Sequence, residues 1–459
     1  MILKHFIPNF AFAKKVFKLI IPIALGQMIV AMVSFIDQFM VGGVDVVKPF
    51  VSVLVASEIM YIAMGVNLGI ALIGDIFVAQ FFGAKMQQKL KDVTKLKVML
   101  NLISGGLVVM LINVFAMPII GLFINNQPLD ETGIMERSLS YLRLISIGHM
   151  MYAVSISFIG SLNTIGHPKY QFFASLCSLV FNITFNFVFI YVLDLGIDGA
   201  AYSTIIARFL EMSLILMFVY LNRKQIWFGW KFWVIDIHIL KAMMRRWLIV
   251  TSQVAFAAGL VAKTIVWTNF YPELANAFGI GYAVSGLLWS TFPGFSAAAK
   301  IIVGKQMARD RFARAYDEAL KMLFLSVVVS LMLGVLVFPF AFWLPQVVGL
   351  TGEEISATRT MIMAESALIS FIVVGIYVFS LLEAGGFSRA STFLNSYYIL
   401  MIVFPFTFLV AKFWHPSFAL AFWLTQVIHF VGVGLISLPF FFNKKWLRNI
   451  TTFHREVIV

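Results

Sequence analysis

The sequence predicts an all-α polytopic membrane protein with twelve transmembrane helices in two six-helix lobes, related by a pseudo-twofold axis along the membrane normal. Three observations predict this fold. Of the 459 residues, 61% are hydrophobic and only 12% are charged, whereas about one quarter of a soluble domain is charged. Twelve apolar stretches approach or exceed the roughly 20 residues that cross a bilayer as a helix. Features of the first six stretches recur in the last six.

The apolar stretches fall into two groups of six. The first group covers residues 19–41, 51–82, 98–124, 144–162, 172–193 and 199–221, and Pro22 in its first member is a candidate helix kink. The second group covers residues 247–270, 277–303, 322–344, 361–382, 393–411 and 418–442. The basic and aromatic segment between them, with Trp227, Trp230 and Trp233, is typical of a membrane interface. We therefore expect an N-terminal lobe at 1–221, a cytoplasmic linker at 222–246, and a C-terminal lobe at 247–459 with a basic cytoplasmic tail.

The positions of the charges predict the orientation of the chain. Lysine and arginine concentrate in alternate connections, whereas the intervening ones carry acids such as Asp130, Glu131 and Glu353. Because cytoplasmic loops of membrane proteins are rich in Lys and Arg, both termini are expected to be cytoplasmic, with the chain a multi-pass protein of the cell (plasma or inner) membrane. The net charge of +13 then reflects topology and contact with anionic lipid headgroups. We expect the lipid bilayer to be a partner, nucleic acid not to be one, and the protein to be a monomer.

Two motifs recur in the same order in both halves. GIALIGDIFVAQFFGAK at 69–85 corresponds to GFSAAAKIIVGKQMARD at 294–310, and SLNTIGHPK at 161–169 corresponds to LLEAGGFSR at 381–389. Each half contains an even number of spans, so the two copies have the same orientation in the membrane. Repeats of this kind are typical of carriers whose substrate site lies between the halves.

Several segments, in order along nearly the whole chain, carry a family resemblance: PIALGQMIVAMVSFIDQFMVGG, VAQFFGAK, NTIGHPK, NITFNFVFIYVLDLGIDGAAYST and VGKQMAR. The chain resembles the multidrug and toxic compound extrusion (MATE) family of the multidrug/oligosaccharidyl-lipid/polysaccharide flippase superfamily. The resemblance implies a secondary active antiporter that exports small organic, often cationic and amphiphilic, compounds by alternating access, driven by a proton or sodium gradient. The rival interpretation is a flippase of a lipid-linked oligosaccharide or polysaccharide precursor.

Asp37 is the principal candidate for the coupling-ion site. A carboxylate inside the bilayer costs roughly 2.5 to 3.5 kcal/mol and usually marks function. Asp37 matches the acid on the first helix with which family members take up the coupling ion. Asn182 and Asn186, four residues apart and so on one helix face, and Thr204 match polar positions around that pocket.

The pocket departs from the family pattern at Asn186, where many prokaryotic relatives have a second acid. Burial of the lone carboxylate favours its neutral form, whereas hydrogen bonds to the anion favour the charged form. We favour a proton as coupling ion, although sodium accepts the same oxygen ligands. No cofactor is expected, and no metal beyond a possible sodium ion at Asp37.

The second half offers charges of its own. Lys263 and Glu365 lie within predicted spans. We expect Lys263 either to form an ion pair with Glu365 or Asp37 or to extend toward the outer interface. Some relatives instead bind the coupling ion through acids on the seventh and tenth helices. The matching positions here are Phe256 and Val374, which cannot bind a cation.

Asp75 and Lys300 occupy equivalent positions in the first pair of motifs and carry opposite charges. We expect them to form a gate, paired when the cleft is closed to the cytoplasm and separated when it opens there. The alternative is that each residue pairs within its own lobe or extends alone toward the headgroups. A catalytic function is not expected, since the HExxH, GxSxG and phosphate-loop motifs do not occur in the sequence.

Overall fold

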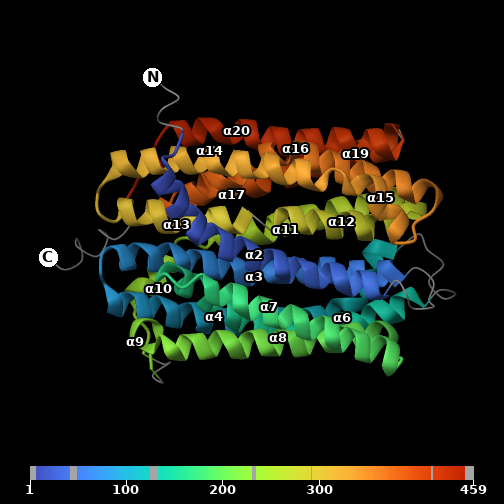
Figure 1. Ribbon diagram of the computed structural model, residues 1–459, viewed down its shortest axis with the longest axis horizontal. Helices are drawn as coiled ribbons and strands as arrows, with labels where there is room; N and C mark the ends of the chain where they lie inside the picture. Colours follow the sequence, from blue (N-terminus) through green and yellow to red (C-terminus); the bar gives the residue numbers. More distant parts are fainter. Residues whose placement is uncertain are drawn as a thin grey trace.

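The computed structural model describes residues 7–41, 49–124, 133–229, 234–290, 292–414 and 417–449, and within these ranges it contains helices and no strand. Twelve helical segments are long and apolar enough to cross a membrane, which confirms the predicted number of spans among the described residues. Figure 1 shows them running along the long axis of the molecule. The predicted linker residues Trp230 and Trp233 and the tail beyond 449 lie outside the described residues.

The first half contains six spans: α2 (Phe10–Val41), α3 (Pro49–Gly83), α4 (Gln87–Ile124), α6 (Ile134–Thr164), α7 (Lys169–Asn186) with its π-helical continuation η1 (Phe187–Val192), and α8 (Gly196–Leu221). Several of these helices begin about three turns before the apolar stretch that predicted them. Hydropathy marks only the residues in the hydrocarbon, whereas the helix continues into the polar interface. Pro22 lies inside α2, which continues through it to Val41.

The second half contains α11 (Leu248–Phe270), α12 (Ala275–Trp289) followed by α13 (Phe292–Met307), α14 (Phe312–Val337), α16 (Gly352–Ala384), and the composite spans Ser388–Trp414 and Phe418–Phe442. A short helix, α15 (Phe340–Val347), follows α14, so the predicted stretch 322–344 is divided between two helices. In Figure 1, α14, α16 and α20 (Gly432–Phe442) lie on one side, α4, α6 and α8 lie on the other, and α2, α3, α11 and α13 lie between them.

The sequence repeat has a counterpart in the backbone of the turns. After α3, Lys85 adopts a positive φ of 63°, and after α13 the equivalent Asp310 adopts one of 56°. The second motif behaves likewise, with Gly166 at 103° and Gly386 at 73°. Each turn closes with a backbone hydrogen bond at the same place, as in Met86 N–H to Phe81 and Arg311 N–H to Gln306. Such matched helix ends support a structural duplication of the two halves.

Glycines bring the halves together at two equivalent places. A Cβ on Gly69 of α3 would lie 2.6 Å from the Cα of Val250 on α11. A Cβ on Gly294 of α13 would lie 3.1 Å from the Cβ of Ala24 on α2. Gly65 and Gly69 form a GxxxG pattern, and small residues at this spacing allow membrane helices to approach closely. The interface between the halves therefore depends on small side chains in both repeats.

The linker packs on the first half. Asp236 caps the short helix α10 (Ile237–Met244) by accepting hydrogen bonds from the N–H groups of His238 and Ile239. Lys89 of α4 forms an ion pair of 2.8 Å with Asp236. The apolar face of α10 adds Ile239 and Met243 to a cluster with Leu90 and Val93 of α4. Both described ends of the chain also lie at this end of the bundle, where Lys321 lies over Phe12 and Asn449 donates a hydrogen bond to the carbonyl of Ala308. We call this end of the bundle, where Lys89, Lys321 and Asn449 lie, the basic end.

Candidate functional site

Asp37 lies in the interior of the first half, with only 2% of its surface exposed. Its Oδ1 accepts hydrogen bonds from Nδ2 of Asn186 at 2.6 Å and Nδ2 of Asn182 at 3.1 Å. Its Oδ2 accepts a bond of 2.8 Å from the hydroxyl of Thr204. The structure thus brings together the four residues that the sequence analysis grouped, from α2, α7 and α8. These donors offset the desolvation of a buried carboxylate.

The two asparagines are held in one orientation by their own partners. The side-chain oxygen of Asn186 accepts a hydrogen bond from the hydroxyl of Ser203, whose single proton is shared with the carbonyl of Ala200. Asn182 accepts from Nδ2 of Asn186 at 3.4 Å. Both amides therefore point their N–H groups at the carboxylate. Ser203 was not among the predicted residues, although it precedes Thr204 directly.

The helix geometry changes next to this pocket. α7 ends at Asn186, and the following turns, η1, are π-helical. Tyr191 of η1 donates a hydrogen bond of 2.6 Å to the carbonyl of Met40, near the end of α2. π-helical turns often occur at functional sites. The π-helical turns of η1 directly follow Asn186 and carry Tyr191, which contacts α2, the helix that carries Asp37.

Arg208 and Glu211, three residues apart, form a local ion pair on α8. Nη1 of Arg208 lies 2.8 Å from Oε2 of Glu211. Ser175 of α7 donates a bond of 2.9 Å to the other carboxylate oxygen. Arg208 thus has a carboxylate of its own and is not the direct partner of Asp37.

A second chain of buried polar groups lies in the second half. Lys263 of α11 donates to Oε1 of Gln426 at 3.4 Å, and Nε2 of Gln426 donates to Oε1 of Glu365 at 3.0 Å. The amide of Gln426 therefore links the lysine to the carboxylate, in place of a direct ion pair. All three side chains are at least 97% buried. Gln426 was not predicted, because an uncharged amide inside an apolar stretch gives no distinctive signal.

Comparison with known proteins shows a family match that includes the first of these two polar groups. The sequence model of the MatE family matches residues 22–188, which include Asp37 and the asparagines of α7. Multidrug and toxin extrusion protein 2 of Mus musculus is 22% identical over 331 residues, covering 69% of this chain and 54% of that protein. Multidrug and toxin extrusion protein 1 of Xenopus tropicalis is also 22% identical, over 71% of this chain and 56% of its own length.

The family model and these relatives support a MATE family transporter. The chain spans about half the length of the vertebrate MATE proteins it matches. The uncharacterized transporter YisQ of Bacillus subtilis is 22% identical over 83% of this chain and 80% of that protein.

Solved structures share the MATE fold. A multidrug resistance MATE family transporter of the MOP superfamily, in an outward-facing conformation, superposes with a TM-score of 0.80 at 16% identity, covering 94% of this chain and 96% of the other. A MOP superfamily transporter from Pyrococcus furiosus gives a TM-score of 0.81 at 16% identity and the same coverage. At these identities the likeness concerns the fold.

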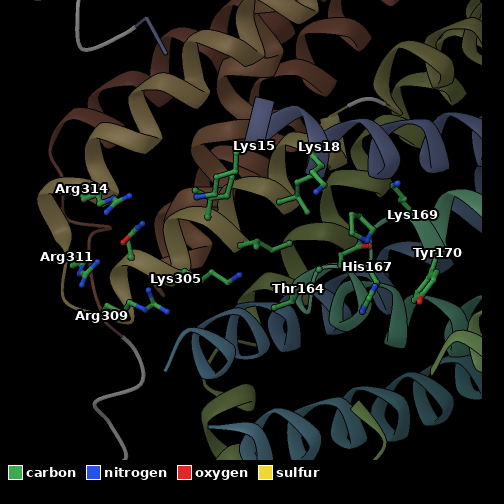
Figure 2. A pocket seen from close by; sticks show the side chains of 17 residues that line it. Lys15, Lys18, Thr164, His167, Lys169, Tyr170, Lys305, Arg309, Arg311 and Arg314 are labelled. Carbon is green, nitrogen blue, oxygen red and sulfur yellow. The ribbon is translucent and has the colours of Figure 1, made fainter. Parts of the chain in front are cut away.

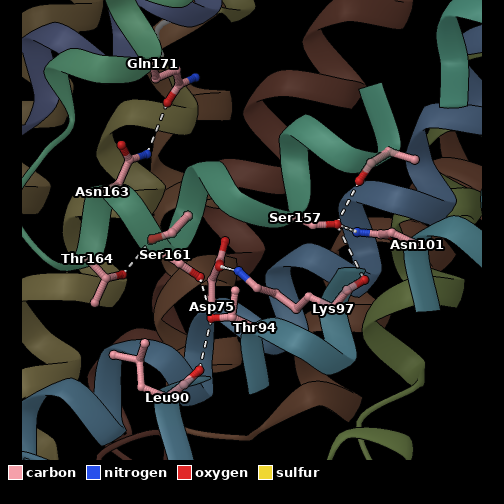
Figure 3. A network of polar contacts seen from close by, with 12 residues as sticks. Asp75, Leu90, Thr94, Lys97, Asn101, Ser157, Ser161, Asn163, Thr164 and Gln171 are labelled. Carbon is pink, nitrogen blue, oxygen red and sulfur yellow. Dashed lines mark hydrogen bonds and ion pairs between the residues drawn. The ribbon is translucent and has the colours of Figure 1, made fainter. Parts of the chain in front are cut away.

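Asp75 and Lys300, the predicted gate pair, are not partners in this structure. Asp75 of α3 pairs with Lys97 of α4 at 2.6 Å, and Lys300 of α13 pairs with Glu383 of α16 at 2.8 Å. Figure 3 shows Lys97 reaching Asp75 within the first half. A buried charge needs a close and well-oriented partner, and each half supplies one on a neighbouring helix. These contacts are those of the alternative in which each lobe neutralises its own charge, and a gate that pairs Asp75 with Lys300 in another conformation stays a prediction.

Lys97 lies just before the third predicted apolar stretch, 98–124. In the structure α4 already begins at Gln87, and Lys97 is fully buried. One turn further along α4, Asn101 donates a hydrogen bond of 2.8 Å to the hydroxyl of Ser157 on α6. Residue spacing gives one signal, since Lys97 and Asn101 lie four apart on one helix face.

Proposed function

We propose that this protein is a secondary active transporter that exports organic compounds, and that exchange of a proton at Asp37 drives the export. The buried carboxylate with its three donors carries this proposal, because an ionisable group inside a membrane usually lies on an ion pathway. The names of the vertebrate relatives, which refer to multidrug and toxin extrusion, support the export of small organic molecules. Cationic amphiphiles are the substrates we expect first.

The orientation of the amides favours a proton over sodium. Sodium binds through oxygen atoms, but the amide groups nearest to Asp37 present their N–H donors to it. The oxygen of Asn186 is occupied by the hydroxyl of Ser203. A sodium ion would require both amides to turn and to lose these bonds, whereas a proton requires no additional oxygen ligand.

The same geometry distinguishes the two oxygens of Asp37. Oδ1 faces two amide N–H groups, which cannot accept a hydrogen bond. Oδ2 faces Oγ1 of Thr204, and a hydroxyl can both donate and accept. We therefore place the transported proton on Oδ2, where Thr204 reverses its role and accepts the bond. This change loosens the contact between α2 and α8 at each turnover.

The duplicated fold supports alternating access of the two lobes as the transport mechanism. The basic end is the cytoplasmic end in this proposal, because Lys and Arg favour that side. Both described ends of the chain lie there, which supports cytoplasmic termini. The plasma or inner membrane is the location that suits an exporter.

Reconstitution in liposomes tests the function. The experiment measures uptake of a cationic fluorescent dye under an imposed pH gradient and, separately, under a sodium gradient. The wild type should accumulate dye under the pH gradient, Asp37→Asn should not, and the control Asp198→Asn, an acid bonded to Ser140 outside the pocket, should do so. Dye uptake that is undiminished in Asp37→Asn contradicts the proposal. Scrambling of lipid-linked headgroups without dye uptake would instead support the flippase.

A further inference from the structure

A cavity of about 500 Å³ opens at the basic end of the molecule. Four segments wall it: the first turns of α2, the connection from α6 to α7, the end of α13, and the start of α14. Figure 2 shows side chains from these segments around the opening. The α6–α7 connection belongs to the first half and α13 to the second, so both halves contribute to one cavity.

The cavity wall is strongly cationic. Seven of its 17 lining residues are Lys or Arg, and none is Asp or Glu. The basic residues come from every segment of the wall: Lys15, Lys18, Lys169, Lys305, Arg309, Arg311 and Arg314.

Neighbouring acids neutralise little of this charge. Arg314 pairs with Glu318 at 3.1 Å, while the nearby Asp310 accepts a bond from Asn449. Lys305 lies 4.5 Å from the centre of the Phe82 ring, and Arg309 donates to the carbonyl of Gly83. In the part of the chain that the structure describes, the six basic residues other than Arg314 form no ion pair with a carboxylate.

The orientation of the protein in the membrane does not by itself account for this arrangement. The positive-inside tendency places basic residues near headgroups around the whole cytoplasmic rim. It does not require them to converge from four segments and two halves on a single cavity. Such a concave group of like charges focuses its field on the enclosed space, where an anion is attracted most strongly.

We propose that this cavity binds a phosphate-bearing anion, either the headgroup of an acidic phospholipid or a soluble organic phosphate. Arginine forks and lysine ammonium groups are the usual partners of phosphate oxygens. The volume exceeds that of a single phosphate and leaves room for the group that carries it. The bound anion contacts both halves, through Lys169 on one side and Lys305 on the other. This site is separate from Asp37 and does not depend on the nature of the coupling ion.

The first arm of the test uses inorganic pyrophosphate and the purified full-length protein in an uncharged detergent. Titration calorimetry compares the wild type with Lys18→Gln/Lys305→Gln, which removes two charges from the cavity. The matched control, Lys241→Gln/Arg245→Gln, removes two charges from the basic end at α10, outside the cavity. Binding to the cavity variant should weaken by at least about tenfold, since each basic group contributes on the order of 1 kcal/mol to the attraction of a phosphate surface. The control should bind as the wild type does.

The second arm distinguishes the two sources of phosphate. Protein is reconstituted in nanodiscs of phosphatidylcholine with and without phosphatidylglycerol, and native mass spectrometry measures the lipid that it retains. Preferential retention of phosphatidylglycerol by the wild type and the control, but not by the cavity variant, supports a lipid headgroup. Pyrophosphate binding without that preference supports a soluble phosphate.

Two results would overturn the proposal. One is that the wild type binds neither probe; the other is that the cavity variant and the control lose binding equally. If Lys18→Gln/Lys305→Gln does not fold, Lys15→Gln/Arg311→Gln replaces it. These two side chains are exposed, form no ion pair among the described residues, and line the same cavity.

Discussion

Oγ1 of Thr204 donates a hydrogen bond of 2.8 Å to Oδ2 of Asp37, joining α8 to α2 in the interior of the first half. Thr204 also accepts from Nδ2 of Asn182 at 3.4 Å. It is the one direct partner of Asp37 found here that can exchange the roles of donor and acceptor. The relationship explains how a lone carboxylate is accommodated in the interior of the first half, and in the proposed function it allows Asp37 to take up a proton without a second acid.

Thr204 provides the first prediction. Thr204→Val keeps the shape of the side chain but removes the hydroxyl, so Oδ2 loses both its donor and its acceptor. A hydrogen bond to a charged group contributes about 1.5 to 3 kcal/mol, so dye uptake under a pH gradient should fall roughly ten- to hundredfold. Thr204→Ser keeps the hydroxyl and should retain most of the uptake. Equal uptake by the valine and serine variants would contradict the role of the hydroxyl.

The ion pair between Lys97 and Asp75 provides the second prediction. Lys97→Met leaves the Asp75 carboxylate, whose side chain is 21% exposed, without its partner, so the cost should stay below the roughly 3 to 5 kcal/mol of a fully buried unpaired charge. The midpoint of thermal unfolding in detergent should still drop. The double variant Lys97→Met/Asp75→Leu should recover much of the loss, because apolar replacements can substitute for a buried pair.

Charge exchange distinguishes this pair from the gate that the sequence suggested. Lys97→Asp/Asp75→Lys should unfold at a higher temperature than either single variant. Asp75→Lys/Lys300→Asp should show no such rescue, because those two residues pair with Lys97 and Glu383. If Asp75→Lys/Lys300→Asp is rescued and Lys97→Asp/Asp75→Lys is not, the result would support the gate between Asp75 and Lys300.

The close contact of α3 with α11 provides the third prediction. In Gly69→Ala the new Cβ would lie 2.6 Å from the backbone of Val250, so the helices must move apart. Overpacking of this kind costs about 1 to 3 kcal/mol. The control is Gly106→Ala on α4, where a Cβ meets nothing within 4 Å. Thermal unfolding should show a loss for the first variant and a small gain for the second, since alanine favours helix. Equal midpoints would show that the interface tolerates a wider separation.

The capping residue of the linker provides the fourth prediction. Partial burial alone would raise the pKa of Asp236. The hydrogen bonds that Asp236 accepts from Lys89, Ile239 and His238, together with the charge of Lys89, outweigh this effect and hold the pKa below its usual range. Since the folded pKa is depressed, the stabilising contribution is complete above the ordinary value of 3.8 and is lost as the pH falls through the folded value.

Two variants separate the charge of Asp236 from its capping role. Asp236→Asn keeps a good helix cap but loses the ion pair, so it should cost about 0.2 to 1 kcal/mol at pH 7. That cost should shrink as the pH falls below 3.8. Asp236→Ala loses the cap as well and should cost about 1 kcal/mol more. Measurement of unfolding midpoints across this pH range checks both, and a cost for Asp236→Asn that does not change with pH would exclude the ion pair.

The sequence predicts the number of spans and the duplicated turns well, because both depend on local signals. Hydropathy marks each span, and the shared motifs place Lys85 and Asp310 at equivalent turns. The four residues around Asp37 were also grouped correctly, because their family positions and the spacing of the two asparagines agree.

The partners of the buried charges could not be predicted in the same way. Spans such as α3 and α11 are apolar on nearly every face, so the sequence does not fix how each helix is rotated against its neighbours. The choice of Lys97 over Lys300 as the partner of Asp75 depends on that rotation. Gln426 illustrates the same limit, since its importance comes only from its position between Lys263 and Glu365.

The most direct test of the account measures the proton movement that depends on Asp37. Proteoliposomes containing a pH-sensitive dye report proton movement when a transported compound is added, with no gradient imposed beforehand. The wild type should move protons in the direction opposite to the compound, and Asp37→Asn should move none while still binding the compound. Compound-driven proton movement of the same size in Asp37→Asn would contradict the account.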